Sequence, residues 1–449
     1  MEKVTLHSKK LHIRKTGVVT DINLYTTIGE AGNSALAVKD GRTTVYAKLG
    51  LPTDSLASPL RVRKSGNTYA VLTATAEPVS TPLFAYTLSN EYLNHGVVGA
   101  IYGDRYASPT TFTVQANKII YLNGEAAVFG FLQGTNSRLV LSQYTGSSIN
   151  LRPNKIIDPF AANWSPPLTE QTWNDVANLH AITAKDPWLC ATSYDLSRIA
   201  VVNMNNNYQE VRSYQFPTAW PAISLPATAR SHGERLTIVG NYLYALFTVN
   251  TEGQTTPYSN SFVVKLLFDR AAGMLMYMKH LEVGKNALTL EHFNNKLYIC
   301  CIGGSQKEGN SNPETCLDII DLATFTKTTV LKSAGMNGNI SSITIADKEH
   351  AYIFMGNYDA DYTNMIGGVY HTTIANIIEP VFWSKVLDVN NSGRFWGVYN
   401  DSNHLWFARG KSIEIFPSLP VGPASSVKSF NLTNLGMSEG DIKSVSRIL

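Results

Sequence analysis

The most regular feature of the chain is a pattern of hydrophobic and polar positions that recurs every 54 residues. In each copy, an apolar run is followed by a short polar turn rich in Asn, Asp, Gly or Lys. A second run of apolar and aromatic residues comes next. Two short apolar runs separated by such a turn are typical of a β-hairpin. The equivalent residues of the second run are Leu189, Leu243, Leu297, Ala351 and Leu405.

Each repeat has room for four strands. In the unit around Leu297 we expect strands at 288–293, 296–302, 316–322 and 326–331, with the first of them innermost. Asn294 and Asn295 would supply a tight hairpin turn between the first two strands. A period of about 40–55 residues with several short strands per unit is the signature of a blade. The sequence therefore predicts an all-β fold, a β-propeller.

The number of blades follows from where the repeats begin. The phrase at 117–121 resembles the turn and second run of the repeat, so six units fit between about residue 119 and the end. The proline-rich segment 152–175 is then interpreted as a loop inserted between blades. We expect six blades, with seven as the alternative if residues 83–116 pair with the C-terminal strands.

Residues 1–78 lack the repeat and are interpreted as a separate small β domain. The stretch 60–72 has apolar residues alternating on both sides of a turn at Gly66, which predicts a hairpin. Residues 79–437 are assigned to the propeller. The tail 438–449 begins with Ser438 three positions before Asp441, a pattern that favours a short C-terminal helix.

The N-terminal segment also carries a resemblance. Its stretches ALAVKDGRTTVYAKLG and SPLRVRKSGNTYAVLT resemble short β modules of phage and prophage structural proteins. The similarity covers about forty residues and carries no residue-level function. It implies that residues 1–78 attach the chain to a larger oligomeric assembly, such as a virion or a phage tail.

Composition and charge narrow the range of partners. Only 16% of the 449 residues are charged, below the usual fraction of about a quarter, and the net charge is +3 with no long basic run. We therefore expect no nucleic-acid partner. No stretch approaches the roughly 18–20 apolar residues of a membrane span. The first ten residues lack the apolar core of a secretory signal, which predicts synthesis in the cytoplasm. A later place in a virion is what the resemblance of the N-terminal segment implies.

The sequence offers little evidence for a metal or a cofactor, and we expect neither. The four cysteines form no Cys-x-x-Cys pair and are interpreted as buried small hydrophobes, although Cys300 and Cys316 could lie close enough to bridge. His350 and His404 share a register, which favours an inherited turn residue over a metal site. The loop with Asp359, Asp361 and Tyr362 lacks the full spacing of a calcium loop and is interpreted as solvated.

Four tryptophans are the candidate binding residues. They lie in or beside proline-rich loops, where exposed indole rings could stack on sugars or anchor a partner. The competing interpretation is that they pin long loops onto the ring. The candidates are Trp164, Trp173, Trp188 and Trp220.

The motifs of propeller enzymes and of common hydrolases are missing, which favours a non-enzymatic role. The leading hypothesis is a structural or recognition component of a phage or phage-derived particle, whose propeller binds proteins or a host-surface ligand. The alternative is a hydrolase or lyase that acts on a glycan or lactone at the central channel. Its candidate residues, which share no repeat register, are Asp186, Glu234, Glu291 and His292.

Overall fold

The computed structural model divides the chain into two compact units, Met1–Val79 and Ser80–Leu449. In the first unit it describes the backbone of the strands. From residue 81 onward it describes the chain except for 91–94, 145–152, 252–256, 305–311, 359–364, 391–395 and the single positions 174, 175, 177, 210, 221, 226 and 337. The predicted turn at Gly66 and the candidate calcium loop at Asp359 and Asp361 lie outside the described residues.

The first unit is one sheet in the order β1-β2-β3-β5-β7-β6, with β4 also pairing with β5. The hairpin predicted at 60–72 is confirmed, because β6 and β7 pair antiparallel with Val62 opposite Tyr69. The strands are β1 (Val4–His7), β2 (Lys10–Lys15), β3 (Val18–Tyr25), β4 (Ala35–Asp40), β5 (Thr43–Gly50), β6 (Ala57–Lys64) and β7 (Asn67–Leu72).

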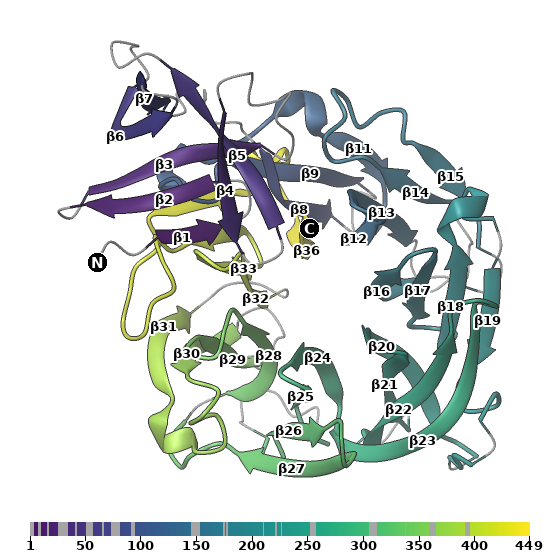
Figure 1. Ribbon diagram of the computed structural model, residues 1–449. Coiled ribbons are helices and arrows are strands. Elements are labelled where there is room, and N and C mark those ends of the chain that lie inside the picture. Colours follow the sequence, from purple (N-terminus) through teal and green to yellow (C-terminus); the bar gives the residue numbers. More distant parts are fainter. Residues whose placement is uncertain are drawn as a thin grey trace. The chain divides into compact units, whose positions relative to one another are not determined.

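The second unit is a ring of seven antiparallel sheets, the blades of a β-propeller (Figure 1). Six blades are formed by consecutive strands, and we number them 2 to 7. Blades 2 to 4 consist of β12 (Glu125–Gln133), β13 (Asn136–Tyr144), β14 (Asn154–Ile157) and β15 (Thr169–Gln171); β16 (Leu179–Lys185), β17 (Trp188–Ser193), β18 (Arg198–Asn203) and β19 (Val211–Gln215); and β20 (Arg230–Val239), β21 (Tyr242–Asn250), β22 (Asn260–Asp269) and β23 (Met274–Lys285).

Blades 5 to 7 repeat the same arrangement, with the first strand of each innermost. They consist of β24 (Ala287–Phe293), β25 (Lys296–Cys301), β26 (Cys316–Asp321) and β27 (Thr326–Leu331); β28 (Asn339–Ile345), β29 (Ala351–Tyr358), β30 (Met365–Thr372) and β31 (Ser384–Asn390); and β32 (Trp396–Asn400), β33 (Leu405–Arg409), β34 (Ser412–Ile415) and β35 (Lys428–Asn431).

Blade 1 is built from both ends of the unit. The C-terminal strand β36 (Asp441–Arg447) is its innermost strand and pairs with β8 (Thr81–Asn90), which pairs with β9 (His95–Gly103). Two short strands, β10 (Thr113–Val114) and β11 (Ile120–Asn123), pair with β9 from outside. This pairing closes the ring, so that no inner edge is left open. The seven-bladed alternative is therefore confirmed, and six blades is wrong.

Blade 1 also corrects two local predictions. Residues 441–447 form a strand rather than a helix, because β8 offers an unpaired edge that a local sequence pattern cannot reveal. The phrase at 117–121 does not begin a blade, since its apolar part is the outer strand β11. In blade 2, the proline-rich segment 152–175 is not an insertion between blades, because it contains β14 and β15.

The repeat itself predicts the strands of blades 3 to 7 well. Its five equivalent residues all lie at or next to the start of the second strand of a blade, and each is fully buried. Around Leu297 the four predicted strands match the observed ones to within about a residue. Asn294 and Asn295 both adopt positive φ angles, 47° and 59°, as a tight two-residue hairpin turn requires.

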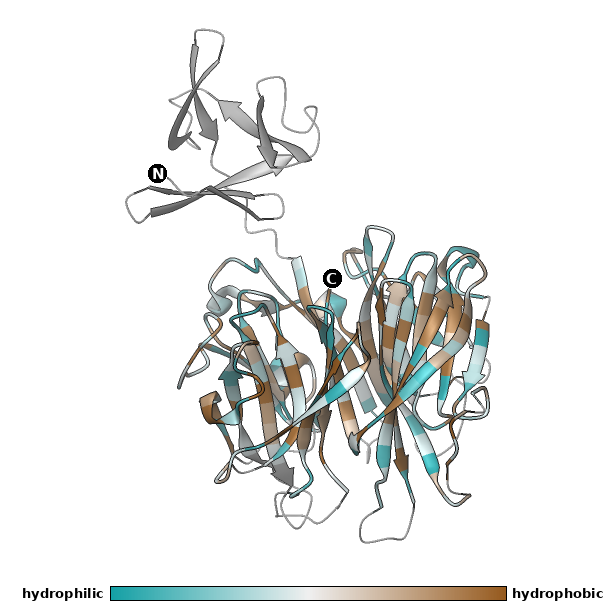
Figure 2. Cartoon of the chain, turned by 60° about the horizontal axis from the view of Figure 1, so that its bottom comes forward, coloured by the Kyte–Doolittle hydropathy of each residue, from teal (hydrophilic) through white to brown (hydrophobic). Residues whose placement is uncertain are grey.

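The hydrophobic core lies between neighbouring blades. Seven clusters of buried side chains each join two adjacent sheets, and the cluster around Trp406 and Ile442 joins blade 7 to blade 1. Figure 2 shows hydrophobic residues concentrated within the strands of the propeller. Close packing also reaches the channel wall, where a Cβ on Gly130 of β12 would lie 2.2 Å from the backbone oxygen of Arg447 on β36.

Helical structure is sparse in the described part of the chain. One four-residue helix, α2 (Leu432–Leu435), is capped by Asn431 and leads towards β36. Four single 3₁₀ turns lie at Pro109–Thr111, Ala116–Lys118, Met204–Asn206 and Pro380–Phe382. Among the described residues, no helix is long and apolar enough to span a membrane.

Candidate functional site: the central channel

The innermost strands surround a central cavity of about 550 Å³. Each of blades 2 to 7 has four antiparallel strands, so the chain leaves such a blade on the same face of the ring on which it entered. The seven innermost strands therefore run in the same direction and start at one end of the channel. All seven contribute residues to the cavity wall. A volume of this size suits a small molecule.

A ring of β-bulges supplies the distinctive residues of this wall. In five of the innermost strands, one residue has no partner on the neighbouring strand, because two residues there oppose one. A bulge redirects a side chain and is common next to binding sites. All five bulge residues line the cavity, and each lies within the first five residues of its strand. They are His180, Glu234, Leu288, Ser341 and Lys443.

Two of these residues form a hydrogen-bonded pair across neighbouring blades. Nδ1 of His180 lies 3.1 Å from Oε2 of Glu234. The Glu234 side chain is only 5% exposed, and its second oxygen accepts a hydrogen bond of 3.1 Å from the Thr248 hydroxyl. The His180 side chain is 36% exposed. A buried, anchored carboxylate thus holds an imidazole that remains accessible from the cavity.

Aromatic stacking fixes the orientation of the same imidazole. The His180 ring stacks on Tyr194, which lies in the turn between β17 and β18, with 4.3 Å between centroids. Tyr194 stacks in turn on His232 of β20 at 4.2 Å. The Arg235 guanidinium donates a hydrogen bond to the backbone oxygen of His180 and also lines the cavity. Glu234 and Tyr194 therefore restrain the His180 ring, and Arg235 restrains its backbone.

The remaining charged groups of the wall come from blades 1 and 5. Nζ of Lys443 lies 2.7 Å from Oε1 of Glu125, which also accepts a hydrogen bond from the Ser89 hydroxyl. Glu291 lines the cavity three residues beyond the bulge at Leu288. Burial raises the pKa of Glu291 to about 7, against the opposing effect of the Arg447 charge. Near neutral pH, the Glu291 side chain is therefore a mixture of the protonated carboxyl group and the carboxylate.

Of the four residues that the sequence proposed for channel chemistry, two lie in the cavity wall and two do not. Glu234 and Glu291 line the cavity. His292 follows Glu291 on β24 but is not part of the wall, and Asp186 is exposed in the turn between β16 and β17. The sequence interpretation missed His180 and Lys443. His180 was detectable, because it precedes Glu234 by one 54-residue period.

The four candidate tryptophans are buried, with exposed fractions of 1–4%. The prediction that these side chains are exposed, on which their binding role depended, is wrong. Three of them donate their indole N–H to a backbone oxygen: Trp164 to Pro159, Trp173 to Tyr208 and Trp188 to Arg270. Trp220 packs among Phe216 and Phe247. These contacts are those of residues that fix loops to the ring.

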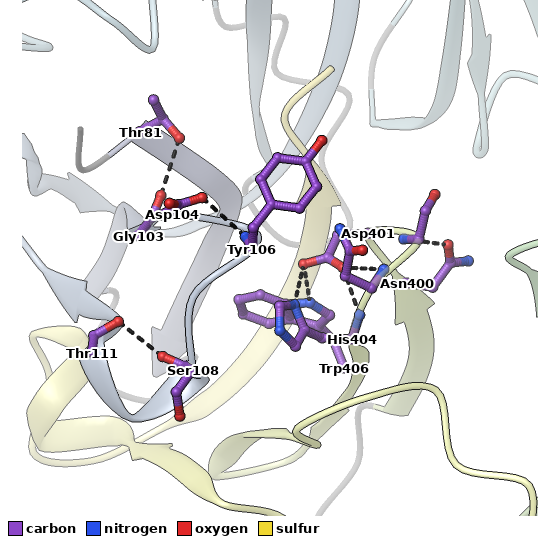
Figure 3. A network of polar contacts seen from close by, with 12 residues as sticks. Thr81, Gly103, Asp104, Tyr106, Ser108, Thr111, Asn400, Asp401, His404 and Trp406 are labelled. Carbon is purple, nitrogen blue, oxygen red and sulfur yellow. Dashed lines mark hydrogen bonds and ion pairs between the residues drawn. The ribbon is translucent and has the colours of Figure 1, made fainter. Parts of the chain in front are cut away.

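The equivalent histidines serve two equivalent turns. In blade 6, Nδ1 of His350 lies 3.0 Å from Oδ1 of Asp347, and in blade 7, Nδ1 of His404 lies 3.0 Å from Oδ2 of Asp401. Asp401 is buried and also accepts hydrogen bonds from the Trp406 indole and from the backbone of His404 (Figure 3). Both histidines therefore bond to an aspartate of their own turn, as expected of a turn residue shared by the two blades.

All four cysteines are buried. This agrees with their interpretation as buried small hydrophobes. The residue opposite Cys316 is Cys301 rather than Cys300, the partner considered as the alternative. The reason is the alternation of a strand, which sends Cys300 and Cys301 to opposite faces. Ligand atoms of Cys301, Cys316 and Asp318 lie within 4.8 Å of one another. Asp318 is already engaged by the Gly284 amide, the Thr329 hydroxyl and Lys327, so this cluster is explained by packing.

Comparisons with known proteins identify the fold alone. No protein-family model matches the chain, and no relative was found among curated proteins. Among solved structures, the chain is similar to a "putative 6-phosphogluconolactonase" from Bacteroides fragilis, with a TM-score of 0.54 and 12% identity over 84% of this chain and 99% of that one. A protein from Lactobacillus plantarum gives a TM-score of 0.52 and 10% identity over 82% and 99%.

Proposed function

We propose that the propeller is a recognition module that binds a small, hydroxyl-rich molecule carrying an acid group in its central channel. The observation that carries this proposal is the ring of bulges, which directs side chains from five blades into one cavity. Bulges interrupt a strand ladder, so an array of them at one end of the channel is better explained by a ligand than by stability.

The wall matches the chemistry of a sugar acid. Five residues that carry hydroxyl groups line the cavity, and a hydroxyl oxygen can accept a hydrogen bond from a ligand hydroxyl. They are Thr289, Ser341, Ser342, Thr344 and Ser444. Arg235 and Lys443 supply positive charge for a carboxylate or phosphate. Apolar side chains, among them Leu288, Leu290 and Val398, can pack against the carbon face of a ring. A few placed polar groups within an apolar wall are typical of ligand sites.

Two further considerations support this ligand class. The Bacteroides fragilis protein of the same fold is named as a lactonase of a phosphorylated sugar acid, which adds sugar acids and lactones to the compounds to test. The N-terminal unit resembles β modules of phage structural proteins, so we propose that it attaches the propeller to a particle. The channel would then recognise an acidic sugar on a host surface.

The experiment is titration calorimetry of the full chain with glucuronate, gluconate and glucose. We expect the two acids to bind at least about tenfold more tightly than glucose, because a charge-assisted hydrogen bond contributes roughly 1.5–3 kcal/mol. Arg235→Gln and Lys443→Gln should each remove most of this preference. Lys428→Gln, on the outermost strand of blade 7, is the matched control and should bind as the wild type does. Equal affinity for acids and glucose, or no binding, would refute the proposal.

A further inference from the structure

The geometry points to a further activity: His180 and Glu234 form a general-base pair that hydrolyses a carboxylic ester or lactone bound in the central cavity. This inference rests on the proposed binding function and adds a reaction to it. It is carried by the contacts of the two side chains, which differ from those of the other histidine–carboxylate pairs in the described part of the chain.

The carboxylate is built to orient the imidazole. Glu234 is buried, and its two oxygens are used by different partners, His180 on one side and Thr248 on the other. The Thr192 hydroxyl also donates to the Glu234 backbone oxygen at 3.3 Å, which holds the bulge in place. A carboxylate that accepts from Nδ1–H keeps the imidazole in the tautomer whose Nε2 has a free lone pair. Nε2 is therefore the nitrogen available to act as a base.

The imidazole is placed where a substrate can reach it. His180 is a bulge residue of the cavity wall and is more exposed than the carboxylate that orients it. The other two pairs lack this arrangement. In the His404–Asp401 pair the imidazole itself is buried, with 5% of its side chain exposed, and His350–Asp347 lies in a turn outside the cavity wall. Of the three pairs, only His180–Glu234 combines a buried orienting group with an imidazole in the cavity.

The same geometry selects the class of bond. Glycoside hydrolysis generally requires two carboxylates that flank the bond, but Glu234 is engaged by His180 and Thr248. Acyl chemistry needs one base of the imidazole type and positive charge or hydrogen-bond donors for the oxyanion. Arg235, whose guanidinium donates to the His180 backbone oxygen and carries further N–H groups, lines the same cavity and is the candidate for that stabilisation.

The reaction consumes only water. Nε2 of His180 takes a proton from a water molecule while the water oxygen bonds to the carbonyl carbon, and the carbonyl oxygen becomes an oxyanion. When the carbonyl re-forms, the bond to the ester oxygen breaks. The leaving alkoxide receives the proton from the imidazolium. The products are an acid and an alcohol, which for a lactone are two groups of one hydroxy acid.

The test measures hydrolysis of p-nitrophenyl acetate and of glucono-δ-lactone by the full chain against the buffer rate. We expect turnover of at least one probe, and His180→Gln should lower kcat by about 100-fold or more, as loss of a general base does. Glu234→Gln should lower kcat less. His292→Gln, at a histidine that lies on the innermost strand of blade 5 but outside the cavity wall, should leave the rate unchanged.

Binding separates this inference from the function on which it rests. Gluconate, the product of the lactone probe, is titrated into the wild type and His180→Gln by calorimetry. If gluconate binds but neither probe is hydrolysed above the buffer rate, the hydrolytic inference fails and the recognition function stands. The inference also fails if His180→Gln hydrolyses as fast as the wild type. If gluconate does not bind and no probe is hydrolysed, both proposals fail.

Discussion

Closure of the ring by β36 makes a quantitative prediction about stability. Three apolar side chains of the C-terminal segment 438–449, which contains β36, are at most 7% exposed: Ile442, Val445 and Ile448. Full burial of such a side chain contributes roughly 1.5–3 kcal/mol, so the segment accounts for roughly 4–9 kcal/mol. Net stabilities are only about 5–15 kcal/mol. A chain that ends at residue 437 should therefore lose most or all of its cooperative unfolding transition.

A point substitution gives a finer measurement. Ile442 is fully buried in the cluster that joins blades 1 and 7, and Ile442→Ala should lower the free energy of unfolding by roughly 2–5 kcal/mol. Urea unfolding followed by tryptophan fluorescence suits this position, because Trp406 belongs to the same cluster. The control is Val427→Ala, at a side chain that is 42% exposed, which should change stability by less than about 0.5 kcal/mol.

Complementation tests the same strand in a second way. A synthetic peptide of residues 438–449, added to the truncated chain, should restore the unfolding transition, because β8 offers it the edge that β36 occupies. A loss of less than about 1 kcal/mol for Ile442→Ala would refute the reasoning. So would a truncated chain that unfolds like the full one, since β36 could not then be the innermost strand of a closed ring.

Two further predictions concern carboxyl groups whose pKa is shifted. The raised pKa of Glu291, about 7 against 4.5, means that its contribution to stability is present below pH 4.5 and is lost as pH rises through 7. Glu291→Gln should abolish this loss of stability, which amounts to roughly 3 kcal/mol at most. The measurement is the melting temperature of both proteins as a function of pH, and the same pH dependence in both would contradict the prediction. For Asp401, burial favours the neutral form, but hydrogen bonds and charge from His404 outweigh it and lower the pKa. In chemical denaturation, Asp401→Ala should lower the free energy of unfolding by roughly 3–5 kcal/mol. The control Asp347→Ala, at a half-exposed side chain, should lower it by less than about 1 kcal/mol. Equal losses in the two variants would show that burial of the carboxylate is not the cause.

The sequence predicts the inner parts of blades 3 to 7 because the same packing recurs there. The residue at the start of each second strand meets the neighbouring blade, so Leu243 and Leu297 stay apolar at a fixed interval. The polar turn before it stays short, because the first two strands form a tight hairpin. Both requirements are local, and a 54-residue period records them directly.

The blade count could not be obtained in the same way. Blade 1 is assembled from β8, β9 and β36, and Tyr86 is paired with Val445 more than 350 positions along the chain. No local pattern records a partner that distant. Blade 2 was obscured for another reason, because β14 and β15 have only four and three residues within a proline-rich segment. Strands that short carry too few alternations to be recognised.

The channel site was only partly predictable. Glu234 and Glu291 were identified as residues of innermost strands, but nothing in composition marks Lys443 or Ser341 as bulge residues. A bulge depends on the register between two strands, which the sequence does not specify residue by residue. The spacing of His180 and Glu234 by one period was the available signal. The tryptophans were misleading, because loops rich in proline need large apolar side chains to hold them.

The unpaired position in five of the inner strands has a consequence for how such a molecule can diversify. A residue outside the strand ladder can be exchanged without breaking a cross-strand pair, so the bulge position of one blade can vary without changing the pairing of its sheet. His180 and Glu234, which are bonded across neighbouring blades, are the exception and would have to change together. Here those positions carry an imidazole, a carboxylate, an isobutyl group, a hydroxyl and an ammonium group. Natural variants or designed libraries that randomise these five codons alone would alter ligand preference while leaving the scaffold intact.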